Sequence, residues 1–590
     1  MVAAPQETMN FPHRLQTAHS MPFGAEVLPQ GGVRFRFWAP AAKWVEVAFP
    51  GNRVVQMQAA GGGWYEHVEI QAGAGTLYQY RIDGELLVPD PASRFQPRDV
   101  DGPSEVIAPR AYKWSDHGWN GRPWNEAVIY ELHVGAFTPE GKYSGVAKKL
   151  GVLRDLGITA IELMPLADFA GRRNWGYDGV LPYAPDSAYG RPEELKALVD
   201  AAHAANMMVF LDVVYNHFGP KGNYLPRYAP QFFTNHYKTP WGAAIDFSNE
   251  VVRRYFIENV LYWLEEYRFD GLRFDAVHAI IDKSPKHILV EIAETVRAKY
   301  GESRHLVLEN DANLARLLGP GRYTAQWNDD SHHAYHVLAT GERDGYYSAY
   351  GEAPARHLAR CLAEGFAYQG EISPFSGGRR GEPSTHLAPS SFVDFMQNHD
   401  QVGNRAFGER LAMLATERTL KALSAIQLLA PSPPLIFMGE EWSCRQPFLF
   451  FCNFEGELAE AVRNGRREEF ARFAAFQDPQ ARSRIPDPLA EATFRQSVLD
   501  WSKRDAITIA HYKKLLLLRA RAIAARKFGP GKYRMLGERA FEVRWEGGLT
   551  LIANCGDQTV SVPEVPPQAP LWSNARPGAP WSVNWWLAAK

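Results

Sequence analysis

The sequence has few cysteines: only Cys361, Cys444, Cys452 and Cys555 occur among 590 residues. Their spacing fits no metal-ligand pattern, and so few thiols cannot build the disulfide framework of a small secreted domain. We therefore expect a reducing, cytoplasmic location. Long hydrophobic runs are absent as well, and without a run of about 18 apolar residues we expect no membrane-spanning helix.

An excess of either charge is also missing, because 64 basic residues face 66 acidic ones. This balance argues against nucleic acid or an acidic membrane surface as a partner. Residues 1–22 lack the basic-then-apolar pattern of a signal peptide, so we expect a flexible leader there. Aromatic residues are abundant, with 17 Trp, 25 Tyr and 32 Phe. Most will be core, but a surplus of Trp and Tyr also suits flat ligands such as sugar rings.

Hydrophobic periodicity divides the chain into three folded parts. Residues 23–112 alternate with period two, as in Arg34–Trp38 and Tyr78–Ile82, and predict a β-sandwich. Residues 113–515 alternate strand and helix patterns, and residues 516–590 predict a helix followed by a small β domain. The segment 217–247, rich in Pro, Gly, Asn and Tyr, is long for a connection and predicts a functional insertion.

Eight candidate strands occur in the middle part, mostly with helical periodicity between them. The strands are Val128–Leu132, Ala160–Met164, Met208–Val214, Gly271–Asp275, Leu306–Leu308, Thr324–Trp327, Phe392–Met396 and Pro434–Met438. Examples of the helices are Glu193–Ala205, Val251–Tyr267, His287–Tyr300 and Leu411–Leu429. Eight such units predict an α/β fold, a closed parallel (β/α)8 TIM barrel, with an N-terminal β-sandwich and a C-terminal small β domain.

Asp275 ends the fourth predicted strand, two residues after Arg273. Residues i and i+2 of a strand face the same side, so the two side chains project together. A neighbouring cation keeps a carboxylate ionised, and a fixed, ionised carboxylate can act as a nucleophile. The alternative is an ordinary structural ion pair.

Two further acids, Glu309 and Asp400, follow the fifth and seventh predicted strands. Each alone could be a helix N-cap, but three acids together with Arg273 and His399 are hard to explain as caps. The reactive groups of such barrels lie at the C-terminal strand ends, so these acids would meet at one mouth. Asp212, which lies within the third strand, is expected to stay outside that mouth.

Two carboxyl groups on adjacent strands can flank one glycosidic bond. At a separation of about 5–5.5 Å, one attacks the anomeric carbon while the other protonates the leaving oxygen. Asp275 beside Arg273 suits the nucleophile, whereas Glu309 at an apolar strand end suits the acid. Asp400 could bind sugar hydroxyls and favour the distorted transition state.

Four blocks resemble the signature regions of the α-amylase superfamily of glycoside hydrolases. They are Asp212–His217, Gly271–Asp275, Glu309 and Asn398–Asp400, and their order and spacing match across the whole barrel. The resemblance implies a retaining double displacement with Asp275 as nucleophile, Glu309 as acid/base and Asp400 as third carboxylate. Phe274 and the residues after Glu309 depart from the usual pattern, which could alter the pocket wall.

Narrower blocks resemble the trehalose-releasing branch of this superfamily. They are Tyr130–Gly141, Asp275–Ile280, Thr340–Tyr347, Gln397–Arg405 and Met438–Trp442 with Pro447–Phe451. Such enzymes cut the α-1,4 bond next to the terminal trehalose of maltooligosyltrehalose and release trehalose and a maltooligosaccharide. The alternatives are a glucan branching or debranching enzyme and a non-catalytic glucan-binding protein, and the latter would be expected to have lost an acid. Oligomeric state stays open.

The candidate substrate-binding residues lie in the same blocks and in the loop after the second strand. They are Arg273, His278, His217, His399, Gln401, Asn404, Tyr177, Asp344 and Trp442. The histidines could instead be structural, Tyr177 could pack within its loop, and Trp442 could form only a wall. Asn216 alone is weak grounds for a calcium site, so we expect neither a metal nor a cofactor.

Overall fold

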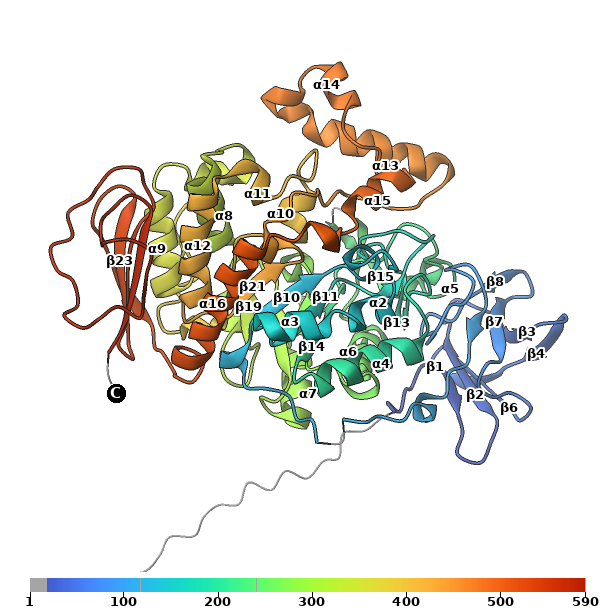
Figure 1. The fold of residues 1–590 in the computed structure, drawn as a ribbon. Coiled ribbons are helices and arrows are strands. Elements are labelled where there is room, and N and C mark those ends of the chain that lie inside the picture. The colour runs from blue at the N-terminus through green and yellow to red at the C-terminus, as the bar shows by residue number, and fades with distance from the viewer. Residues whose placement is uncertain (1–17, 117, 240, 589–590) are drawn as a thin grey trace, which may run out of the picture.

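The computed structural model describes residues 18–116, 118–239 and 241–588. Figure 1 shows three parts: a β-sandwich near the N-terminus in blue, a central barrel, and a small β domain at the C-terminal end in red. No helix among the described residues is long and apolar enough to cross a membrane.

The predicted barrel is confirmed, because eight parallel strands close into one sheet with the first strand paired to the last. The strands are β10 (Ile129–Leu132), β11 (Ala160–Leu163), β14 (Met208–Val213), β17 (Gly271–Phe274), β18 (His305–Leu308), β19 (Ala325–Trp327), β20 (Phe392–Phe395) and β21 (Pro434–Phe437). The surrounding helices include α3 (Leu150–Leu156), α4 (Pro192–Ala204), α6 (Glu250–Glu266), α7 (Ile288–Tyr300), α8 (Asp329–Thr340), α9 (Pro354–Glu364), α12 (Glu417–Leu429) and α16 (Ala506–Ala522).

The barrel interior is apolar at one end and charged at the other. Ile129, Phe210 and Trp327 belong to an apolar cluster that fills the lower interior. Two residues further along β10 and β14, on the same side of each strand, stand Glu131 and Asp212. Because alternate residues of a strand face the same side, the next inward-facing positions form a layer of buried charged residues. This layer lies above the apolar one, at the carboxyl ends of the strands.

The N-terminal sandwich consists of two antiparallel sheets in the orders β1-β2-β6-β5 and β4-β3-β7-β8. Its strands are β1 (Gly24–Val27), β2 (Val33–Trp38), β3 (Val45–Phe49), β4 (Arg53–Gln56), β5 (Gln58–Gly61), β6 (Trp64–Glu69), β7 (Leu77–Ile82) and β8 (Leu86–Val88). Phe37 and Trp38 of β2 pack on Tyr228 and Phe232. The sandwich is thus attached to the barrel through the insertion that follows β14.

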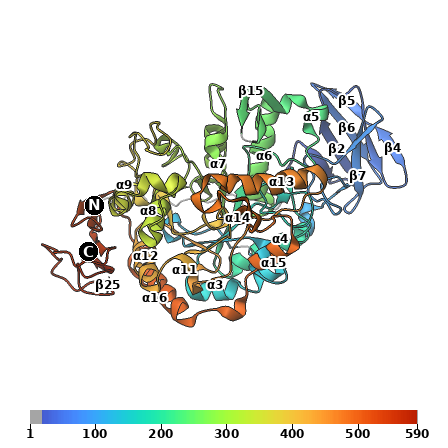
Figure 2. The same ribbon diagram turned by 90° about the horizontal axis from the view of Figure 1, so that it is seen from above.

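That insertion contains helix α5 (Leu225–Tyr228) and a hairpin of β15 (Phe233–Thr239) and β16 (Gly242–Ile245). A second projection follows β21 and consists of α13 (Gly456–Glu469) and α14 (Pro479–Ser483). We call residues 456–485 the arm. Seen from above, the arm runs over the top of the barrel (Figure 2).

The C-terminal sheet has the order β22-β23-β24-β26-β25. Its strands are β22 (Gly531–Met535), β23 (Ala540–Trp545), β24 (Leu549–Asn554), β25 (Trp572–Ser573) and β26 (Ser582–Leu587). It packs on α9, and Trp545 stacks on Trp585 within it. The expected boundary at 515/516 falls inside α16, which packs on α12 as an outer barrel helix. The sequence pattern could not reveal that α16 belongs to the barrel, because this helix leads into the C-terminal β domain without a break in the pattern.

Two other predictions need correction. The single helix expected over 411–429 is interrupted, with α11 (Leu411–Leu414) and α12 separated by Thr416, whose side chain caps α12. The expected leader, residues 1–22, lies outside the described residues up to position 17. Its described part packs against α6, where His19 is buried and its imidazole contacts Glu258 and Glu265 at 2.7 and 2.9 Å.

Candidate active site

Arg273 is the centre of the charged layer at the mouth of the barrel. Its guanidinium is fully buried and stacks on Trp327 at 4.2 Å. Nη1 donates to Asp212 at 2.7 Å and to Asp275 at 2.8 Å, and Nη2 lies 2.9 Å from Glu309 Oε2. One cation therefore holds carboxyl groups from three neighbouring strands side by side.

The backbone after Asp275 is shaped to complete this arrangement. Ala276 has φ 39° and ψ 48°, in the left-handed region that a residue with a side chain rarely adopts. In this conformation its amide donates to Glu309 Oε2 at 2.7 Å, and the next amide, Val277 N–H, donates to the Glu309 carbonyl. Local strain of this kind persists where the surrounding contacts over-determine it, commonly at active sites.

The same surroundings move the pKa values of Asp275 and Glu309 in opposite directions. Burial alone would raise the pKa of Asp275, but Arg273 and a hydrogen bond from Asn216 outweigh it and leave the pKa below the ordinary value. Burial raises the pKa of Glu309 well above its ordinary value, and the carboxylates Asp275 and Asp400 add to that effect. These surroundings thus favour the ionised form of Asp275 and the protonated form of Glu309.

Asp400 lies in the first turn of α10 (His399–Gly403), whose N-cap is the Asn398 side chain. Its carboxylate is 35% exposed, more than Asp275 or Glu309, and lies 3.5 Å from His399 Nε2. His399 is itself fully buried, and Tyr177 stacks on it at 5.0 Å while donating its hydroxyl to Asp212 at 2.6 Å. Tyr177 therefore joins the Asp400 side of the mouth to the Arg273 cluster.

His217 borders the mouth on the side of the insertion. Its Nε2 contacts the Tyr177 carbonyl at 3.0 Å, and burial lowers the pKa of its imidazole. Trp241, from the β15–β16 turn, stacks on His217 with ring centroids 4.5 Å apart and planes at 9°. Because Trp241 is 48% exposed, this stack presents an aromatic face to solvent beside Asp275.

Four other predicted binding residues either are exposed loop residues or belong to the segment that carries Asp400. His278 is exposed after β17, Gln401 and Asn404 belong to the Asp400 segment, and Asp344 is exposed just before the 3-10 helix 345–350. That helix meets the Asp400 segment, because the Tyr346 hydroxyl donates to Gln401 at 2.9 Å. Asn404 donates to Asp400 at 3.2 Å.

The structure places Trp442 away from this mouth, contrary to the prediction that it binds substrate. Its side chain is only 2% exposed and packs on Trp501 at 4.9 Å, in a 3-10 turn that contacts α16. The sequence placed it after the eighth strand, as it placed Asp400 after the seventh. The chain turns outward at Gly439, whose φ of 90° sends the following residues into the barrel wall.

Three residues of the site were missed or misplaced by sequence reasoning. Asp212 is one β-strand residue below the mouth but contacts Arg273 directly, and Asn216 donates to Asp275 Oδ2 at 2.9 Å rather than standing alone. Asp329 follows β19 and is near enough to raise the pKa of Glu309. Its place after a strand, like that of Glu309 and Asp400, was the available signal.

The arm is tied to the segment that carries Asp400. Arg466 of α13 is buried, and its Nη2 donates to the carbonyls of Gly403 and Arg405 at 2.8 and 3.1 Å. Its guanidinium lies over Phe450 and Phe470. These bonds satisfy carbonyls at the end of α10, so the arm helps to fix the position of Asp400.

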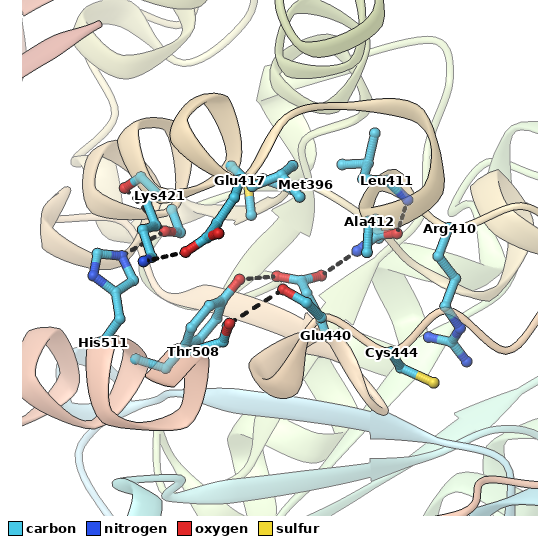
Figure 3. A pocket seen from close by; sticks show the side chains of 15 residues that line it. Met396, Arg410, Leu411, Ala412, Glu417, Lys421, Glu440, Cys444, Thr508 and His511 are labelled. Atoms are coloured by element: carbon cyan, nitrogen blue, oxygen red, sulfur yellow. Dashed lines mark hydrogen bonds and ion pairs between the residues drawn. The ribbon is translucent and has the colours of Figure 1, made fainter. Parts of the chain in front are cut away.

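A small pocket lies behind the same segment, between α12 and α16 (Figure 3). Its Glu440 carboxyl accepts from Gln397 and from Tyr512, both at 3.1 Å, and burial raises the pKa of Glu440 to about 7. The cavity of about 20 Å³ has room for a water molecule but not for a sugar ring. The Glu440 carboxyl thus holds the side chain of Gln397, which precedes the Asp400 turn. The pocket itself is separate from the mouth.

The described residues contain no cluster of three or more His, Cys, Asp or Glu side chains arranged to hold a metal ion. The chemistry available at the mouth is that of an ionised carboxylate beside a protonated one. Such a pair can carry out a glycosyl transfer through nucleophilic attack and proton donation.

Comparison with known proteins assigns the three parts to families. Residues 94–238 match the α-amylase catalytic domain, residues 22–93 match carbohydrate-binding module 48 (isoamylase N-terminal domain), and residues 529–585 match a domain of unknown function.

Curated relatives cover most of the chain. It is 44% identical to malto-oligosyltrehalose trehalohydrolase of Deinococcus radiodurans, over 86% of this chain and 85% of that protein. The protein of the same name from Saccharolobus solfataricus is 41% identical, over 85% of this chain and 87% of that one. A crystal structure from Salmonella typhimurium, described as an alpha amylase, matches with TM-score 0.92 and 46% identity, over 96% of this chain and 100% of that one. This chain therefore belongs to the malto-oligosyltrehalose trehalohydrolase family, within the α-amylase superfamily.

Proposed function

We propose that this protein hydrolyses the α-1,4-glucosidic bond next to the terminal trehalose unit of maltooligosyltrehalose, releasing trehalose and a maltooligosaccharide. The observation that carries the proposal is the single guanidinium of Arg273 held between Asp275 and Glu309 on adjacent strands. This pairing supplies an ionised nucleophile beside a protonated acid, as a retaining glycosidase requires. Family membership supplies the choice of substrate.

In the first step, the Asp275 carboxylate attacks the anomeric carbon and Glu309 gives its proton to the leaving glycosidic oxygen. The oxygen departs on trehalose, and the maltooligosaccharide is bound to Asp275 through an ester. In the second step, the Glu309 carboxylate takes a proton from water, which attacks the anomeric carbon and frees Asp275. The low pKa of Asp275 and the raised pKa of Glu309 fit these assignments.

Asp400 has a different role in this scheme. Its greater exposure and its contacts with His399 and Asn404 suit a carboxylate that accepts hydrogen bonds from sugar hydroxyls. Such bonds strengthen as the ring flattens towards the oxocarbenium-like transition state. The stacked pair of His217 and Trp241 offers a flat surface beside Asp275 on which a sugar ring can pack.

The substrate assignment is tested by a comparison of two glucans of equal length. Maltooligosyltrehalose and the plain maltooligosaccharide are incubated separately with the protein, and the products are separated by chromatography. We expect rapid release of trehalose from the first and slow cleavage of the second. New α-1,6 linkages would indicate a branching enzyme instead, and equal cleavage of both substrates would contradict trehalose selectivity.

The nucleophile is tested by Asp275→Asn. The amide keeps the size of the side chain but cannot form the glycosyl ester, so turnover should fall by several orders of magnitude. Thermal unfolding and trehalose binding should change little. A near-normal rate in this variant would show that Asp275 is not the nucleophile.

A further inference from the structure

Glu131 of β10 contacts His399 inside the barrel through both of its carboxylate oxygens. The Glu131 Oε1 atom lies 2.5 Å from His399 Nδ1, and Oε2 accepts the His399 backbone N–H at 3.0 Å. Both side chains are about 1% exposed. The two contacts fix the ring and its backbone together, so His399 has no freedom to turn.

These contacts occupy Nδ1 of the imidazole and leave its other nitrogen, Nε2, on the side of Asp400. His399 Nε2 is buried, has no hydrogen-bond partner among the described residues, and lies 3.5 Å from Asp400 Oδ1. Tyr177 covers one face of the ring, and Trp175 meets it edge-on at 5.6 Å. A buried polar atom without a partner is costly, and a substrate hydroxyl at Asp400 would relieve that cost.

We propose that Glu131 is a positioning residue, which holds His399 as a cation with Nε2 directed towards Asp400 and the substrate. The inference rests on the proposed function, since it concerns the same site. Glu131 touches neither the substrate nor the reacting atoms in this scheme. It acts only through the imidazole, as the buried acid behind a catalytic histidine does in other hydrolases.

The charges around the imidazole agree with this role. Six titratable groups influence His399 from the surrounding elements: Glu131, Glu162, Asp212, Arg273, Asp400 and His133. Burial alone would lower the pKa of His399, but Asp400 and Glu131 raise it to about 9. Because a carboxylate favours the protonated ring, removal of the Glu131 charge must lower that pKa.

Glu162 provides a matched control on the next strand. It pairs in register with Glu131, and its Oε2 is buried without a hydrogen-bond partner among the described residues. Burial and the neighbouring acids Glu131 and Asp212 raise the pKa of Glu162 well above its ordinary value, which favours its neutral form. The same change from carboxyl to amide therefore alters the acid that contacts His399 at Glu131, and at Glu162 it alters one that has no hydrogen bond to His399 among the described residues.

The test measures the pH dependence of kcat/KM for Glu131→Gln, Glu131→Asp and Glu162→Gln. We expect Glu131→Gln to lose about 10- to 100-fold at pH 7, the scale on which loss of an orienting partner acts at a metal-ligating histidine. Its alkaline limb should move to lower pH, with partial recovery of rate near pH 5. Glu131→Asp, which keeps the charge but shortens the reach, should lose rate with the limb in place. Glu162→Gln should match the wild type.

A double-mutant cycle decides whether Glu131 acts through His399. In a His399→Ala background, Glu131→Gln should cost almost nothing further, because the group it orients is gone. Additive losses, equal losses in Glu131→Gln and Glu162→Gln, or an unmoved alkaline limb would each overturn the proposal. Unfolding midpoints of every variant identify losses that come from misfolding.

The rates are measured on whichever glucan the wild type cleaves faster. If the wild type released no trehalose, the proposed substrate would be wrong, but the ratios between variants would still test Glu131. If trehalose were released and the ratios showed no coupling to His399, only the role of Glu131 would fail.

Discussion

Replacement of Arg273 by Met removes the guanidinium that contacts Asp212, Asp275 and Glu309. Methionine fills much of the same volume and can still pack on Trp327, so the change is chiefly electrostatic. An opposite charge within 4–6 Å lowers a carboxyl pKa by about 1–3 units, or roughly 1.4–4 kcal/mol. Without it, burial dominates at Asp275, and its pKa should rise by about that amount.

The assay is the pH profile of kcat/KM for trehalose release. The wild-type acid limb reports the ionisation of Asp275 and should lie below the ordinary range of an aspartate, because Arg273 and Asn216 lower the pKa of this group. In Arg273→Met the limb should move upward by about one to three units. Activity at pH 7 should fall as well, because the nucleophile and the acid are no longer held together. Loss of a buried ion partner should also destabilise the fold by about 3–5 kcal/mol.

Arg519→Met is the matched control for this experiment. Arg519 is equally buried, but its guanidinium donates to the carbonyls of Leu428, Ala430 and Ser432, not to the carboxylates of the mouth. The control should lower the urea midpoint and leave the acid limb unchanged. An unmoved acid limb in Arg273→Met, or an equal shift in both variants, would refute the reasoning.

Three further predictions concern the surroundings of the site. Arg466→Ala should lower kcat with little change in KM, because the carbonyls that end α10 lose their donor and Asp400 loses its support; an unchanged kcat would contradict that role. Gly403→Ala should reduce both activity and the unfolding midpoint, since a Cβ there would lie 2.1 Å from Trp175, and overpacking costs about 1–3 kcal/mol. Trp442→Phe should lower the unfolding midpoint while kcat and KM stay unchanged, and a raised KM would return Trp442 to the substrate site.

The sequence predicted the barrel well because its eight strands are short, apolar and separated by helical periods. It also predicted the positions of Asp275, Glu309 and Asp400, since the carboxyl ends of parallel strands meet at one mouth. It failed at Asp212 and Trp442 for geometric reasons. A residue one step inside a strand still reaches a long guanidinium, and a residue five positions after a strand can turn away into the wall.

The sequence predicted different roles for the two acids because Arg273 stands beside Asp275, but in the structure both Asp275 and Glu309 contact Arg273, so other neighbours must distinguish them. Asp275 also accepts a hydrogen bond from Asn216, at 2.9 Å. Glu309 instead faces other acids, Asp275, Asp400 and Asp329, which disfavour a second negative charge beside them. Asn216, Asp329 and Asp400 follow β14, β19 and β20, which are strands other than those that carry Asp275 and Glu309. The strand on which an acid lies gives its position, and the residues that converge on it from other strands decide whether it attacks or donates a proton.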